Sequence, residues 1–166
     1  MPTSTERLAL HAGARSLITD AEFADVTATV QDNNPDMAAD VAERIVEEAL
    51  KFMAACAVTR GGGLNPSRVV DEGWHALILH TGVYARLCER LGRFVHHVPE
   101  RADPIRHDPA ALDRTQQAIV DAGYEPDLTL WPAPTDESIP VSANCEHSPP
   151  GPNGSCTGDC SNSGPN

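Results

Sequence analysis

The chain has 166 residues, and 24 acidic residues against 12 basic ones give it a net charge of −12. This length suits one domain with a sizeable core, and the charge argues against nucleic acid or an anionic membrane as a partner because both would repel the protein. No apolar run approaches the roughly 18 residues of a membrane-spanning helix, and the first residues lack the apolar centre of a secretory signal, so we expect a cytoplasmic protein.

Helix-start signals open the first half of the chain. Thr3 and Thr19 each precede a glutamate by three positions, which is the spacing of a capping box. Asn34 followed by Pro35 is typical of an N-cap with proline at the first helical position, so we expect the longest helix to begin there. Apolar residues then recur at every fourth position and predict one buried face. They are Met37, Val41, Ile45, Ala49 and Met53.

Similar signals follow the glycines at 61–63, which should end that helix. Asn65-Pro66 or Ser67 begins the next helix, and Thr81 could cap a continuation that ends at Gly92. The apolar face expected along these helices consists of Val70, Trp74, Leu77, Ile78, Tyr84, Cys88 and Leu91.

A last helix is expected from Asp108-Pro109 to Gly123. Strand-like alternation is confined to short pieces at 94–98 and 128–131. The sequence therefore predicts an all-α fold, a compact bundle of five or six helices.

The composition changes near Pro132. From there to Asn166 the chain has no Lys or Arg and is rich in Pro, Ser, Gly and Asn. Such a stretch cannot bury enough apolar surface to offset the entropy lost on ordering. We expect a helical domain over residues 1–131 and a disordered, cysteine-containing tail over residues 132–166.

Residues 69–99 hold four of the seven histidines. The candidate metal ligands of this segment are Asp71, His75, His80, His96 and His97. On a helix, Asp71 and His75 lie one turn apart on one flank, so they could share a metal ion or form a hydrogen bond. His80 falls on the opposite flank and could join them only if the helix breaks near it.

His96 and His97 precede a proline by a few residues, in a stretch that we expect to be extended. Neighbouring side chains then point to opposite sides, so one of the two histidines should face inward. Trp74 and Tyr84 would form the wall of the site.

These residues suit a divalent metal site, with zinc, iron or copper as the ion, because such sites need three or four converging N, S or O ligands. An acid–base pair of His75 with Asp71 is a second possibility. The spacing is not that of a zincin, and neither Ser67 nor Cys88 stands in a setting typical of a nucleophile. A histidine beside an apolar face is often only a packing residue, so a helical interaction module without chemistry is the alternative.

Part of this segment resembles a known family. The run Val70-Asp71-x-x-Trp74-His75, then Tyr84-x-x-x-Cys88, Gly92 and His97-x-Pro99, is similar to the core of the glycine-rich-domain-protein-like family of uncharacterised helical proteins. The resemblance covers about 30 residues and implies a helical fold and a role for Asp71, Trp74, His75 and His97. The family commonly has a second histidine two residues after the first, where this chain has Leu77. The resemblance implies no reaction.

The tail raises a separate question. It contains Cys145, His147, Cys156 and Cys160 in a stretch where no core explains them. They could form a loose metal-binding tetrad, or be incidental residues of a solvated tail. They could also belong to the core of a ribosomally made, post-translationally modified peptide. In that case the helical domain would act as a leader, with peptide-modifying enzymes as its partners.

Overall fold

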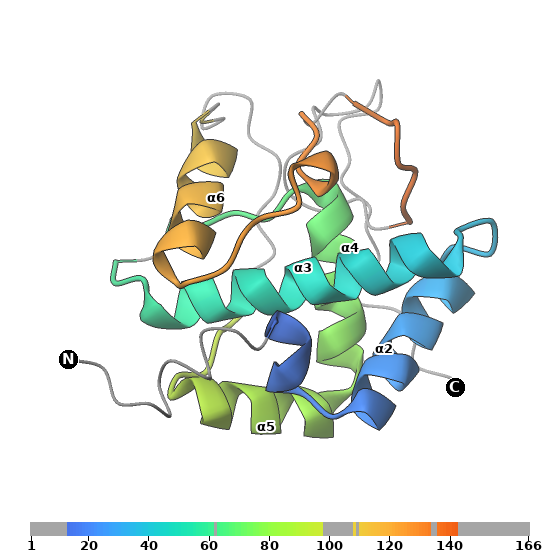
Figure 1. The fold of residues 1–166 in the computed structure, drawn as a ribbon, viewed down its shortest axis with the longest axis horizontal. Coiled ribbons are helices and arrows are strands. Elements are labelled where there is room, and N and C mark those ends of the chain that lie inside the picture. Colours follow the sequence, from blue (N-terminus) through green and yellow to red (C-terminus); the bar gives the residue numbers. More distant parts are fainter. Residues whose placement is uncertain (1–12, 62, 98–107, 109, 134–135, 143–166) are drawn as a thin grey trace, which may run out of the picture.

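The computed structural model describes residues 13–61, 63–97, 108, 110–133 and 136–142. Within these residues the chain forms five α-helices and two short 3-10 helices and no strand, so the predicted all-α fold is confirmed (Figure 1). The elements are η1 (Ala14–Leu17), α2 (Asp20–Asn33), α3 (Ala39–Val58), α4 (Arg68–Leu79), α5 (Thr81–Leu91), α6 (Ala111–Asp121) and η2 (Leu128–Leu130). None of the described helices is long and apolar enough to cross a membrane.

Helix α3 runs through the centre of the fold, and the other elements gather around it (Figure 1). Helices α2, α4 and α6 and the short η1 pack against it, while α5 packs mainly against α4. The predicted apolar face of α3 is buried at Ile45, Ala49 and Met53, as expected from the four-residue spacing. Burial of these side chains against several helices at once supplies most of the driving force for folding.

The cap of α2 confirms the second predicted capping box. The Glu22 amide donates to the Thr19 hydroxyl at 3.2 Å, and the Thr19 amide donates to the Glu22 carboxylate at 2.8 Å. This backbone bond from Thr19, followed by the Arg86 guanidinium, lowers the pKa of Glu22 to about 2. The first predicted box, at Thr3, lies outside the described residues.

The predicted start of α3 is wrong. The helix begins at Ala39, and Asn34 instead follows the last residue of α2 as its C-cap. The Asn34 side chain is buried and donates to the Val30 carbonyl at 2.8 Å and to Glu72 at 2.9 Å. A cap needs the side-chain oxygen as its acceptor, and this oxygen instead accepts from the Ser142 amide at 2.8 Å, so it is not available to the free N–H groups of a following helix.

Other predicted helix limits agree closely with the structure. The Ser67 hydroxyl caps α4 by accepting from the Val70 amide at 3.1 Å. Thr81 is the first residue of α5, while His80 takes the cap position that we expected Thr81 to hold. Gly92 ends α5 in the left-handed conformation, with φ of +76°. Helix α6 begins at Ala111, close to Asp108.

The two strand-like pieces are not strands. Residues 94–97 are irregular, and Leu128–Leu130 is the 3-10 helix η2. The Asp127 side chain accepts from the Thr129 amide at 3.2 Å, which fixes a turn at this point. The Trp131 indole then donates to the buried carboxylate of Glu48 on α3 at 2.8 Å, so this segment is fastened to the central helix.

Part of the segment expected to be a tail lies against the helices. Ile139 and Val141 pack on the apolar core, and the Ser142 amide donates to the Asn34 side chain at 2.8 Å. Residues within 136–142, which we expected to belong to the tail, therefore contact the helical domain. The predicted tail ligands Cys145, His147, Cys156 and Cys160 lie outside the described residues.

Gly73 sets the distance between α3 and α4. A Cβ atom at this position would lie 2.8 Å from the carbonyl oxygen of Ile45 and 2.9 Å from the Cβ atom of Ala49. Only a glycine allows the two backbones to approach this closely without a shift. The close approach places the face of α4 that carries Asp71 and His75 beside the core.

Candidate metal centre

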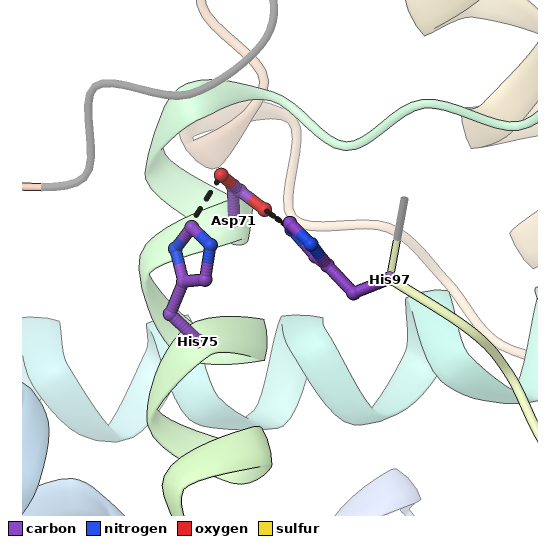
Figure 2. Close-up of side chains that lie close together, drawn as sticks. All are labelled: Asp71, His75 and His97. Carbon is purple, nitrogen blue, oxygen red and sulfur yellow. Dashed lines mark ion pairs between the residues drawn. The ribbon is translucent and has the colours of Figure 1, made fainter. Parts of the chain in front are cut away.

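Three predicted ligands meet between α4 and the segment that follows α5 (Figure 2). His75 Nδ1 lies 3.5 Å from one carboxylate oxygen of Asp71, and His97 Nε2 lies 3.4 Å from the other. Figure 2 shows the carboxylate between the two rings, with one oxygen toward each. One ligand atom from each residue can be chosen so that all three lie within 4.8 Å of one another.

The helix geometry accounts for two of these positions. Asp71 and His75 are four residues apart on α4 and share one flank, as the helical wheel predicts. His97 arrives because α5 ends at Gly92 and the chain then returns toward α4. The rings of His75 and His97 are 4.7 Å apart between their centroids, so the two histidines face the same small volume.

The carboxylate of Asp71 is buried without a hydrogen-bond donor. Its side chain is 1% exposed, and neither oxygen has a hydrogen-bond partner among the described residues. The distances to the two imidazoles exceed the length of about 2.7 to 3.2 Å that N–H···O hydrogen bonds have. The site therefore holds a carboxylate that is close to two imidazoles but is not hydrogen bonded to them.

Burial also favours the neutral form of His75. Loss of solvent lowers the pKa of this imidazole, and the nearby Asp71 carboxylate opposes the shift without reversing it. A neutral imidazole has the free lone pair that a metal ion needs. The side chains of His75 and His97 are 18% and 11% exposed, so the imidazole side of the site reaches solvent.

The spacing of the three groups suits a small ion. Ligand atoms that lie about 2.1 Å from a tetrahedral ion are roughly 3.4 Å apart. The two carboxylate–imidazole distances of 3.4 and 3.5 Å are close to this value, although they end on different oxygens of Asp71; with one atom from each residue, all three lie within 4.8 Å of one another. Asp71, His75 and His97 could therefore hold a metal ion with small adjustments of their side chains.

The two predicted wall residues differ in their contacts: Trp74 packs on His97, and Tyr84 is hydrogen bonded to Trp74. The Trp74 ring packs on the His97 ring, with 4.5 Å between centroids. Tyr84 is buried, and its hydroxyl accepts from the Trp74 indole at 3.0 Å and donates to the Val95 carbonyl. Burial raises the pKa of Tyr84, so the phenol stays protonated and keeps its donor.

Two predicted histidines do not join this cluster. The helix break expected near His80 is present, but His80 Nε2 lies 2.7 Å from the Thr29 hydroxyl on α2. His96 is exposed, and its ring lies tilted against the Phe94 ring, with 4.7 Å between centroids. Of the two adjacent histidines, His97 is the one that faces inward.

A family model matches residues 14–119, which is more than half of the chain. The chain belongs to the UCP032817-like family. This family is uncharacterised, and the match does not confirm the resemblance to the glycine-rich-domain-protein-like family. The region shared with UCP032817-like proteins contains all three residues of the cluster. Comparisons with curated proteins and with solved structures gave no match.

One further residue of this UCP032817-like protein was missed at the sequence level. Glu72 follows Asp71 on α4, is 2% exposed and accepts from Asn34 at 2.9 Å. Its charge raises the pKa of His75, although less than burial lowers it. The spacing of three residues between Glu72 and His75 was the signal that could have pointed to it.

Proposed function

We propose that the protein binds one divalent transition-metal ion through Asp71, His75 and His97. The convergence of three ligand atoms within 4.8 Å around a buried carboxylate is the observation that supports it. A buried carboxylate without donors is costly unless a cation or a set of hydrogen bonds compensates its charge. A bound ion would supply that compensation and occupy the space between the two rings.

The types of the three ligands limit which metal ions the site could hold and what the ion could do. Two imidazoles with one carboxylate are found in catalytic zinc sites and in mononuclear ferrous sites, and imidazole also suits copper. Structural zinc sites usually have four protein ligands, whereas three leave a position for water or substrate. We therefore propose a site with an exchangeable position, in which the ion could activate a bound water or polarise a substrate oxygen.

Metal titration of the full chain tests this proposal. The protein is stripped with a chelator and titrated with Zn²⁺, with Fe²⁺ under anaerobic conditions and with Cu²⁺, while calorimetry and elemental analysis measure affinity and stoichiometry. We expect one ion per chain, with affinity falling at least about 100-fold in His75→Ala and in His97→Ala because each removes one of three ligands. Circular dichroism verifies that each variant is folded.

Matched variants separate this site from the other histidines and from the tail. His96→Ala removes the exposed neighbour of His97, and His80→Ala removes the histidine bonded to Thr29, so both should bind metal as the wild type does. The triple variant Cys145→Ser/Cys156→Ser/Cys160→Ser removes the tail thiols and should also keep its ion. If the ion is lost with these thiols, or is retained by a His75→Ala/His97→Ala double variant, the proposed site is wrong.

A further inference from the structure

His97 is the only residue of the triad that does not lie on a helix, because residues 94–97 have no regular secondary structure. A ligand on such a segment needs support from neighbouring groups if it is to stay within a few tenths of an ångström of its partners. Two supports among those in the described structure lie on the Tyr84 side of His97. The Trp74 ring packs on the imidazole itself, and the backbone two residues earlier is held at the Val95 carbonyl.

One hydroxyl group contacts both supports. The Tyr84 hydroxyl accepts from the Trp74 indole N–H at 3.0 Å and donates its proton to the Val95 carbonyl. It thereby joins the ring that packs on His97 to the backbone that leads to His97. Tyr84 and Val95 are 6% and 8% exposed, so water has little access to replace either bond.

We infer that Tyr84 is a positioning residue, whose hydroxyl holds His97 in place beside Asp71 and His75. This inference rests on the proposed metal site. The hydroxyl acts on His97 through its hydrogen bonds with Trp74 and Val95. Groups of this kind, which orient a ligand without binding the ion, typically change metal affinity by about 10- to 100-fold when they are removed.

Tyr84→Phe removes the hydroxyl and keeps the ring. We expect the affinity of the full chain for Co²⁺ to fall about 10- to 100-fold, and the visible absorption of bound Co²⁺ to change because the imidazole of His97 is no longer fixed. In the metal-free protein, the ring-proton resonances of His97 should also move, since Trp74 no longer holds a constant position over them. Comparison with His97→Ala assigns these resonances.

Thr115→Val is the matched control for the loss of a buried hydroxyl. Thr115 lies on α6, is fully buried and accepts from the Asn65 amide at 3.0 Å. Valine removes this hydroxyl at nearly constant volume, so the variant should lose stability without changing either the Co²⁺ spectrum or the His97 resonances. A general loss of stability would affect both variants alike, whereas positioning affects Tyr84→Phe alone.

The two measurements keep this inference distinct from the metal site. If Tyr84→Phe binds Co²⁺ with wild-type affinity, or leaves the His97 resonances unchanged, then Tyr84 does not position His97. Neither result would contradict the proposed metal site. If the wild type itself binds no ion, the metal site is wrong, and the resonances of the metal-free protein still decide whether Tyr84 fixes His97. Weaker Co²⁺ binding together with shifted resonances supports the role of Tyr84.

Discussion

Asp71 is the residue at which we expect stability and the proposed metal binding to oppose each other. Its carboxylate is 1% exposed and has no hydrogen-bond donor among the described residues. An unsatisfied buried group costs about 1 to 3 kcal/mol, and more when it is charged. Asp71→Asn removes the charge at constant size, and its amide could donate to a neighbouring imidazole nitrogen. We expect the metal-free variant to gain about 1 kcal/mol in free energy of unfolding while its affinity for Zn²⁺ falls at least about tenfold.

Urea unfolding with a chelator, and again with Zn²⁺, measures both effects. The order of stability should reverse between the two conditions, with Asp71→Asn above the wild type in chelator and below it in Zn²⁺. His96→Ala, at an exposed position, should leave the order unchanged. An asparagine variant that is less stable than the wild type in both conditions would mean that the carboxylate is already compensated within the folded protein.

The histidines show how far single residues could be predicted. Helical spacing was enough to place Asp71 beside His75, because both lie on one helix. Alternation in residues 94–97 indicated that one of the two adjacent histidines faces inward, but not which one. The choice follows from Val95, which is buried beside the Tyr84 hydroxyl and turns His97 to the same side. That contact joins two separate segments, so no pattern in the sequence around the histidines indicates it.

At the scale of elements, the crossing of α3 and α4 depends on Gly73. A Cβ atom there would lie 2.8 Å from the Ile45 carbonyl oxygen, which is backbone and cannot rotate away. We expect Gly73→Ala to lower the free energy of unfolding by about 1 to 3 kcal/mol, as overpacking in a close-packed core does. Thermal unfolding followed by circular dichroism measures the loss as a lower midpoint.

Gly82→Ala is the control for this substitution. Gly82 also lies in a helix, α5, but a Cβ atom there would meet only the end of the flexible Arg86 side chain, at 3.4 Å. Alanine favours a helix by up to about 1 kcal/mol over glycine, so this variant should be as stable as the wild type or more stable. Equal midpoints for the two variants would show that α4 moves away from α3 at little cost.

Helix starts and stops were predictable where the deciding contacts are local, as at the Thr19 capping box and the positive φ of Gly92. They were not predictable where a side chain serves distant segments. Asn34 resembled an N-cap, yet its amide bonds Glu72 and Ser142, which are 38 and 108 residues away. Glu48 on α3 is likewise the buried acceptor for Trp131, which is 83 residues away.

At the scale of the whole molecule, an ion in the proposed site would join α4 to the segment after α5. A ligand that binds only the folded state adds about 2.7 kcal/mol of stability at 100 times its dissociation constant. The net charge of −12 will also attract divalent cations without a specific site. Any stabilisation by the metal must therefore be compared with the stabilisation that a cation of equal charge gives when that cation prefers oxygen ligands.

We expect Zn²⁺ at 100 times its dissociation constant to raise the unfolding midpoint by roughly 5 to 10 °C, given about 2 to 4 °C per kcal/mol for a chain of this size. Mg²⁺ at the same concentration should shift it little, because imidazole is a poor ligand for that ion. In His97→Ala the Zn²⁺ shift should fall to the level of Mg²⁺, since only Asp71 and His75 of α4 remain. Differential scanning calorimetry over a series of Zn²⁺ concentrations measures the effect. A shift of similar size with Mg²⁺, or in His97→Ala, would assign the stabilisation to the overall negative charge instead of to the triad.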